Sequence, residues 1–231
     1  MKKTVLTLII IMMIGSLTAA ENDLWDKARN FVESGLNLVP GKIVNTTIML
    51  NKKKEEKSRT EIITKTQQEN EGISVSFIKG NRDGTDLTEE DKEVEAILQQ
   101  DFKPSEDSFF DNIISYEKTS EEKKINGKDC VVFQYTGEKT RTEKKKKVNV
   151  TVTGKLWIEE STGIPVMREF VTDPLPKKVK KMNMIIYYAS IDNGCTESEV
   201  NVEMLVSFLL MKFRVNTNMN FSEFWEYEGI E

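Results

Sequence analysis

The chain of 231 residues contains no histidine. This absence excludes Ser-His-Asp and Cys-His nucleophilic catalysis, histidine-ligated zinc and histidine general bases. Carboxylate chemistry such as glycoside hydrolysis remains possible, but the 38 acidic residues show no spacing that singles out a working pair. We therefore expect a protein without enzymatic activity, cofactor or bound metal.

Cysteine is scarce, with Cys130 and Cys195 as the only two. Export to an oxidising compartment allows a disulfide, and closing so long a loop would contribute about 4 kcal/mol in the chain-entropy model. A chain of this length does not need such a crosslink, and Cys130 lies in a strand-like segment whereas Cys195 lies in a loop-like one. The sequence leaves their pairing open.

Positive charge is in deficit, because 33 basic residues face 38 acidic ones and the net charge is −5. Two of the lysines lie in the first 20 residues, which carry no acid, so the remainder of the chain is more acidic still. Phosphate binding requires a basic face. We therefore expect no nucleic-acid partner.

Only the N-terminus carries a long apolar run. Lys2 and Lys3 precede the apolar residues 4–14, and Ala19 and Ala20 are the small residues that signal peptidase accepts. This pattern predicts a signal peptide at residues 1–20. An uncleaved anchor is the alternative, although the run is short against the roughly 20 residues that span a bilayer. We expect an exported or periplasmic protein, soluble after cleavage, with residues 21–231 forming one domain.

Two segments have helical periodicity. Residues 22–35 place apolar side chains on one side and end at Gly35, a common helix terminator. Residues 87–100 begin with Thr88 as the expected N-cap, and their apolar stripe is narrow. The stripe of the first helix comprises Leu24, Trp25, Ala28, Phe31 and Val32, and that of the second comprises Leu87, Asp91, Val94, Ile97 and Leu98.

The rest of the chain consists of short segments rich in Ile, Val and Thr, separated by polar turns. They predict about 10 to 11 antiparallel strands, hence a mainly β fold with α, in which one curved sheet carries the helices on one face. Residues 204–213 are apolar in both phases of a strand. Such a strand is covered on both sides, either as a doubly packed central strand or with a ligand cavity on one side.

The stretch "GKLWIEESTGIPVMREF", residues 154–170, reads as two strands around a polar turn. Trp157, Thr162, Gly163 and Pro165 in this stretch resemble the W-x(4)-T-G-x-P hairpin of the LolA/LolB-like superfamily, which includes the outer membrane lipoprotein-sorting proteins. The resemblance implies an incomplete β-barrel whose two helices cover a concave apolar face that holds acyl chains. Members carry lipoproteins, bind lipids or sense envelope stress. Residues 101–104, "DFKP", correspond to a family loop but in a different order.

These features lead to a ligand hypothesis. We expect an apolar cavity that holds a lipid acyl chain or a lipidated protein, as in lipoprotein sorting. The alternative is an envelope sensor or scaffold that binds a protein partner. A carboxylate enzyme is a third reading, with Glu203 and Asp91 as the acids closest to apolar sequence. The residues expected to line the cavity are Val94, Leu98, Met182, Met184, Ile186, Met204, Val206, Phe208 and Leu210.

Three basic tracts, Lys52–Lys54, Lys144–Lys147 and Lys177–Lys181, interrupt the strand pattern. Lysine at hairpin tips and edge strands discourages aggregation between sheets. The same residues would attract anionic lipid headgroups, at about 1 kcal/mol for each lysine near the surface. Transient contact with an anionic membrane surface requires that the tracts share one rim.

Overall fold

The computed structural model describes residues 23–69, 72–100, 102, 104, 108–143, 146–208 and 211–228. The expected signal peptide at residues 1–20 lies outside this part. An N-terminal helix occupies residues 23–34. The other elements are β1 (Leu38–Val39), β2 (Lys42–Leu50), β3 (Glu56–Glu69), β4 (Gly72–Arg82), β5 (Thr85–Asp86), α2 (Lys92–Leu98), the 3-10 helix η1 (Phe109–Asn112), β6 (Ile113–Ile125), β7 (Lys128–Glu143), β8 (Lys146–Glu159), β9 (Pro165–Asp173), β10 (Val179–Ile191), β11 (Gly194–Phe208), β12 (Met211–Ser222) and β13 (Trp225–Glu226).

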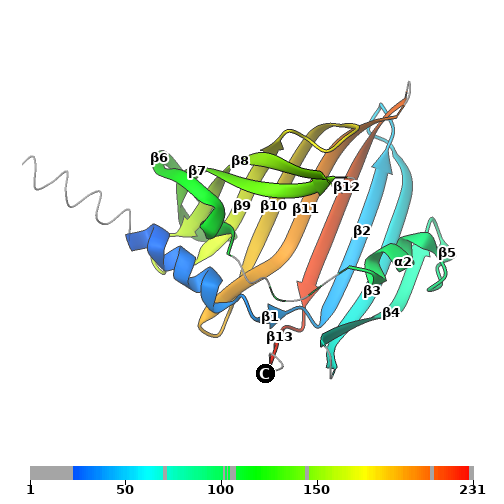
Figure 1. The fold of residues 1–231 in the computed structure, drawn as a ribbon, viewed down its shortest axis with the longest axis horizontal. Coiled ribbons are helices and arrows are strands. Elements are labelled where there is room, and N and C mark those ends of the chain that lie inside the picture. Colours follow the sequence, from blue (N-terminus) through cyan, green and yellow to red (C-terminus); the bar gives the residue numbers. More distant parts are fainter. Residues whose placement is uncertain are drawn as a thin grey trace, which may run out of the picture.

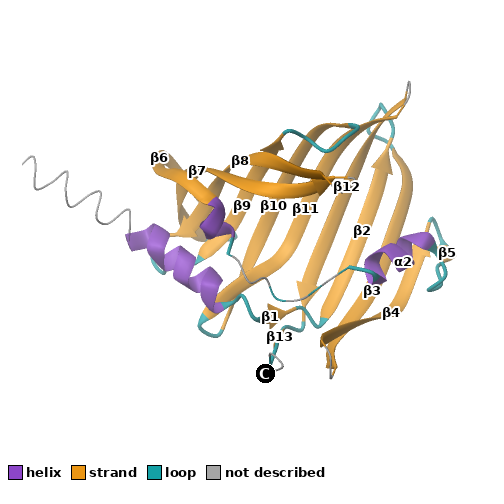
Figure 2. Ribbon diagram, in the orientation of Figure 1, coloured by secondary structure: helices purple, strands orange, loops and turns teal. Residues whose placement is uncertain are grey.

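One antiparallel sheet of 11 strands dominates the molecule. Its order is β5-β4-β3-β2-β12-β11-β10-β9-β8-β7-β6, and β1 pairs with β13 in a separate ribbon. The sheet curves without closing, and the helices lie on its concave side (Figures 1 and 2). The predicted fold class is confirmed: a mainly β protein with a large, unclosed antiparallel sheet and, within the described ranges, two α-helices.

The N-terminal helix packs as the sequence indicates. Trp25, Ala28 and Val32 are buried in the main core against Phe133 and Leu156 of the sheet. The helix ends just before Gly35, and glycine is required at this position because a Cβ there would lie 2.2 Å from the carbonyl oxygen of Cys195. The prediction of the first helix is therefore confirmed, and Gly35 after it is the residue that lets the backbone of Cys195 approach closely.

The second helix is shorter than predicted. It spans Lys92–Leu98 with Asp91 at the N-cap, and the side chain of Thr88 makes no cap. Instead the backbone amide and hydroxyl of Thr88 donate to Asp91 Oδ2, at 2.8 and 3.1 Å, and hold the preceding turn. The stripe prediction is correct, since Val94 and Ile97 pack on Ile62 of β3.

The prediction of one doubly apolar strand over residues 204–213 is wrong. Strand β11 ends at Phe208 and β12 begins at Met211, and the two pair antiparallel with these residues opposite each other. The chain therefore reverses inside the apolar run, where no glycine, proline or asparagine announces a turn. Consequently the described apolar residues of the run are divided between two neighbouring strands, and Val206 of β11 lies opposite Phe213 of β12.

The hairpin of residues 154–170 is confirmed. Trp157 lies opposite Met167, and Ile158 lies opposite Pro165. The turn is closed by the Gly163 amide, which donates to the Glu159 carbonyl at 2.8 Å, and Gly163 has a φ of +81° that glycine adopts without strain. Trp157 packs in a cluster on the convex side, away from the concave face.

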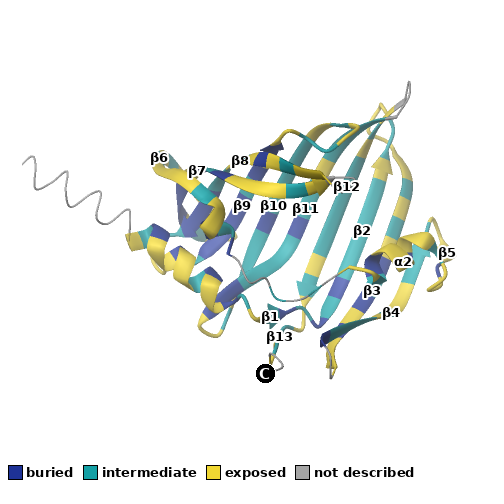
Figure 3. Cartoon of the chain, in the orientation of Figure 1, coloured by how far each residue is buried: buried dark blue, intermediate teal, exposed yellow. Residues whose placement is uncertain are grey.

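The two cysteines are free and buried in different places. Cys195 belongs to the core under the N-terminal helix, whereas Cys130 belongs to the cluster around Trp157 on the other side of the sheet. No disulfide joins them. Buried positions concentrate beneath the N-terminal helix and α2, and the middle of the sheet is of intermediate burial (Figure 3).

Candidate ligand pocket

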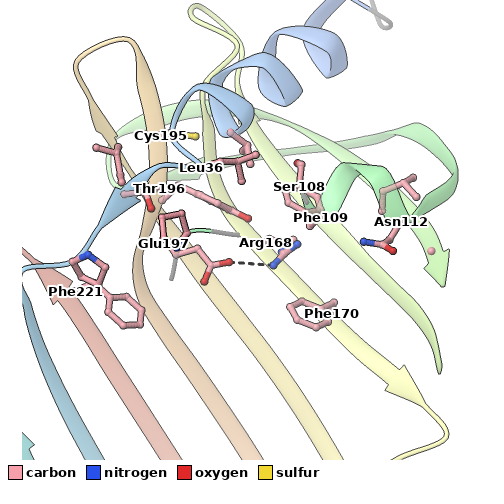
Figure 4. A pocket seen from close by; sticks show the side chains of 18 of the residues that line it. Leu36, Ser108, Phe109, Asn112, Arg168, Phe170, Cys195, Thr196, Glu197 and Phe221 are labelled. Atoms are coloured by element: carbon pink, nitrogen blue, oxygen red, sulfur yellow. Dashed lines mark hydrogen bonds and ion pairs between the residues drawn. The ribbon is translucent and has the colours of Figure 1, made fainter. Parts of the chain in front are cut away.

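A cavity of about 530 Å³ opens on the concave face. This volume falls within the roughly 300–1,000 Å³ of small-molecule sites. The N-terminal helix and the segment after it form one wall, and strands β6 to β12 with η1 form the others (Figure 4). The lining residues are Val32, Gly35, Leu36, Leu38, Pro40, Phe102, Pro104, Ser108, Phe109, Asn112, Ile113, Tyr135, Gly137, Lys139, Val152, Arg168, Phe170, Tyr188, Cys195, Thr196, Glu197, Phe221 and Phe224.

Aromatic rings make up much of the wall. Phe109, Phe170 and Phe221 come from η1, β9 and β12, and Phe102 and Pro104 come from the connection between α2 and η1. Thus two residues of the "DFKP" stretch reach this cavity. A concave site with aromatic walls suits an apolar ligand segment.

Arg168 is the charged group at the centre of the cavity (Figure 4). It is only 8% exposed. Its Cζ lies 4.0 Å from the centroid of the Phe109 ring and 4.9 Å from that of Phe170. Its Nη2 lies 3.4 Å from Oε1 of Glu197, whose side chain is 44% exposed. The guanidinium is thus held between rings and has one weak ionic contact.

Three buried polar atoms around the cavity have no hydrogen-bond partner in the part of the chain that the structure describes. They are Nε of Arg168 and the hydroxyl oxygens of Tyr135 and Tyr188. The Tyr135 hydroxyl lies over Gly154, where a Cβ would be 2.8 Å from it. Leaving a buried donor unsatisfied costs about 1–3 kcal/mol, so these atoms favour a polar occupant.

Burial shifts the acid–base behaviour of these groups. Desolvation raises the pKa of Tyr135 to about 12, although Arg168 opposes the shift. Desolvation also raises the pKa of Tyr188 far above its ordinary value, so both phenols remain protonated donors at neutral pH. Burial by itself lowers the pKa of Arg168, but the net shift is upward, so the guanidinium stays charged.

Lys139 adds a second cation at the cavity wall. Its pKa is lowered, chiefly by desolvation and further by the nearby charges of Arg168 and Arg141, while Glu197 acts in the opposite direction. Glu197 is the only carboxylate among the described lining residues. The cavity therefore has an excess of positive charge, which favours an anion.

Seven of the nine residues expected to line a cavity have side chains that the structure describes. None of them lines the 530 Å³ cavity in the described part. Val94 is fully buried on the side of α2 that packs against Ile62 of β3, with Leu98 of the same helix beside this cluster, and Ile186 is buried in the main core. Leu210 and the side chain of Phe208 lie outside the described residues. The remaining members are the half-buried Met182, Met184, Met204 and Val206.

These half-buried residues extend the concave face away from the cavity. Met184 pairs with Phe170 of the cavity wall, and Met182 pairs with Met204 one row further along. Ile186 lies opposite Arg168, and the strand from Ile186 to Val179 advances by seven steps, or about 23 Å at 3.3 Å per step. Whether this apolar track contacts a ligand stays a prediction.

The central polar residues of the cavity were missed from the sequence. In "PVMREFV", Arg168 and Phe170 are two residues apart and therefore lie on the same face of the strand, the face toward the cavity. An arginine on the inward face of a strand could have indicated a polar site. Tyr188 continues the alternation of Met182, Met184 and Ile186, which is visible in the sequence. Nothing local in the sequence indicates that Tyr135 or Glu197 joins them, because β7 and β11 are brought together by the sheet.

The acids proposed for a carboxylate enzyme do not meet. Glu203 is exposed on β11, and the pKa of Asp91 is lowered, chiefly by the hydrogen bond from the backbone of Thr88. No helix in the described ranges is long and apolar enough to cross a membrane. The same ranges contain no group of three or more Cys, Asp or Glu side chains that could hold a metal ion.

Comparisons with known proteins give a distant likeness of fold. No family model matches the sequence, and no curated protein matches it. Among solved structures, the chain is similar to a DUF1329 family protein from Desulfovibrio piger, with 12% identity, a TM-score of 0.37, and coverage of 91% of this chain and 94% of that one. It is also similar to MucB from the Pseudomonas aeruginosa MucA/MucB complex, with 11% identity, a TM-score of 0.26, and coverage of 90% of this chain and 100% of that one.

Proposed function

We propose that the protein is an exported, non-enzymatic carrier that binds the acyl chain of a lipid or lipidated protein on its concave face. The observation that carries this proposal is the aromatic-walled cavity around Arg168. It combines apolar walls with a few converging polar groups, the usual composition of a site for an amphipathic small molecule. The apolar track through Met184 and Met204 supplies further surface for a long chain, and methionine adapts readily to variable apolar ligands.

The placement of the basic tracts supports delivery to a membrane. Neighbouring strands of the sheet run antiparallel, so the connections β2–β3, β7–β8, β9–β10 and β11–β12 lie at the same end of the strands. The tract Lys52–Lys54 lies in the β2–β3 connection, and Lys177–Lys181 runs from the β9–β10 connection into the start of β10. Lys146 and Lys147 begin β8 beside the β7–β8 connection. These lysines are exposed. The apolar track ends at this basic rim, where lipid headgroups would be attracted.

Purification with its lipids tests the carrier proposal. The full-length chain would be expressed in a bacterium that exports it, purified from the envelope without detergent, and analysed by native mass spectrometry and by organic extraction. We expect a stoichiometric amphiphile. Purification free of any amphiphile, followed by failure to take up fluorescent fatty acids in vitro, would overturn the proposal.

A scaffold that binds a protein partner is the second candidate. The observation that favours it is the edge strand β6, where Ile114 is 64% exposed. An exposed edge can accept a strand from another chain. Crosslinking through a photoreactive residue at position 114 tests this candidate. We expect one partner protein to be crosslinked. If no protein is crosslinked and the purified protein contains bound lipid, the result favours the carrier.

A further inference from the structure

We infer that the cavity holds an anionic, oxygen-bearing headgroup, with Arg168, Tyr135 and Tyr188 as the groups that bind it, and that the ligand's single alkyl chain follows the apolar track. This inference rests on the proposed carrier function and specifies its ligand class. A fatty-acid carboxylate and an alkyl phosphate share this headgroup chemistry, and the test separates them.

The burial of Arg168 is the first step. A guanidinium that is only 8% exposed has lost most of its hydration, and such a charge is normally paired and hydrogen-bonded. Here its ionic contact is a 3.4 Å approach to a half-exposed carboxylate, and its Nε is unpartnered. The structure therefore holds a desolvated cation whose charge is incompletely compensated.

The two tyrosines supply the second step. Their hydroxyls are also buried and without partner in the described residues, and both phenols stay protonated because desolvation raises the pKa of each. Each can donate one O–H, and Arg168 Nε can donate one N–H. A carboxylate or phosphate has two or more acceptor oxygens and would take these donors. A neutral alcohol, with one oxygen, cannot take all three.

The direction of the chain is the third step. Phe170 is both a ring beside the guanidinium and the register partner of Met184. From Met184 the concave face continues through Val202 and the Met182–Met204 pair toward the lysine-bearing end of the sheet. A headgroup at Arg168 therefore places the alkyl chain on the methionines that the sequence singled out.

The test compares ligands of one chain length and different headgroups. Dodecanoate, dodecyl phosphate, dodecanol and dodecyltrimethylammonium would be titrated into the delipidated full-length protein by isothermal calorimetry. We expect one of the two anions to bind at least about tenfold more tightly than dodecanol, the size of one charge-assisted hydrogen bond. The preferred anion identifies carboxylate or phosphate as the source.

Matched variants locate the effect. Arg168→Met, Tyr135→Phe and Tyr188→Phe should each reduce the preference for the anion, with Arg168→Met removing it. Tyr187→Phe is the control for Tyr188→Phe, because Tyr187 packs with the cluster on the other side of the sheet, and the exposed Arg214→Met controls for the loss of an arginine. A thermal melt separates binding from folding: Arg168→Met should melt no lower than the wild type, since an incompletely paired buried charge is removed.

Three results would overturn the inference. Equal affinity of the wild type for dodecanoate, dodecyl phosphate and dodecanol would show that the cavity does not discriminate between headgroups, although the carrier function would stand. An anion preference that survives Arg168→Met would place the headgroup elsewhere. No binding of any of the four amphiphiles would reject both the headgroup site and the carrier function.

Discussion

Arg168 and Glu197 approach each other inside the cavity, with Nη2 of the arginine 3.4 Å from Oε1 of the glutamate. The two residues differ greatly in environment, since the arginine is buried and the glutamate side chain is 44% exposed. The carboxylate can therefore turn to solvent when another anion arrives. This pair makes Glu197 a competitor for the proposed headgroup.

The substitution Glu197→Gln should tighten anion binding. Removing the competing negative charge leaves Arg168 less compensated, and an ion pair of this length and exposure is worth about 0–1 kcal/mol. We expect dodecanoate affinity to rise by up to about fivefold, with little change in the free energy of unfolding. Calorimetric titration measures the first quantity and urea denaturation the second. Weaker binding in the variant would mean that Glu197 itself contacts the ligand.

Gly35→Ala should destabilise the protein. The added Cβ would lie 2.2 Å from the backbone oxygen of Cys195, and the backbone cannot yield as a flexible side chain would. We expect a loss of about 2 kcal/mol or more, the upper range for overpacking and strain. Urea denaturation measures it. The exposed neighbour Ser34 provides the control Ser34→Ala, which should change stability by less than about 0.5 kcal/mol.

Val94→Ala separates core packing from ligand contact. Val94 is fully buried between α2 and β3, so its truncation should cost about 1–3 kcal/mol in the free energy of unfolding. Because the residue is absent from the cavity lining, the affinity for dodecanoate should not change. Lys92→Ala on the exposed side of the same helix is the control for both measurements. A selective loss of affinity without loss of stability would restore Val94 to the ligand site.

Stability should fall at alkaline pH. Desolvation raises the pKa of Cys195 from 9.0 to about 12 and that of Tyr135 from 10.0 to about 12. The folded state therefore retains protons that the unfolded state releases, so this stabilisation is complete below pH 9 and is lost as pH rises from 9 to 12. Denaturation midpoints across this window measure the slope. Cys195→Ala should flatten it, and an unchanged slope would contradict the assignment to the thiol.

Charge removal at the basic rim should weaken membrane association. The combined variant Lys52→Gln, Lys53→Gln, Lys180→Gln and Lys181→Gln removes two charges from the β2–β3 connection and two from the first residues of β10, at the same end of the sheet. We expect sedimentation with vesicles of 30% phosphatidylglycerol at low salt to fall at least about tenfold, since each lysine contributes roughly 1 kcal/mol.

The matched control for that variant removes four exposed lysines away from the rim. Lys65, Lys79 and Lys92 are exposed on β3, β4 and α2, and Lys124 is exposed near the opposite end of β6. Their replacement by glutamine changes the net charge equally but should leave most vesicle binding intact. Equal losses in the two variants would show a net-charge effect and argue against a docking rim.

Local features of the chain could be predicted because they depend on neighbours in sequence. The N-terminal helix follows from its apolar periodicity and Gly35, and the hairpin around Gly163 follows from a turn that needs a positive φ. The fold class follows from the number and alternation of strand-like segments. Prediction failed where the local signal was missing, as at the reversal between Phe208 and Met211.

The cavity was decided by the tertiary structure. Its polar centre brings Tyr135, Arg168 and Glu197 together from β7, β9 and β11, and only the order and curvature of the sheet make them neighbours. Likewise each lysine tract could be read as a hairpin tip from the sequence, but their common rim depends on strand pairing across the whole sheet. Sequence by itself determined which segments form strands and which phase of each is apolar, because both follow from short-range periodicity. Which polar groups those apolar faces enclose depended on contacts between residues far apart in the chain, which only the assembled sheet specifies.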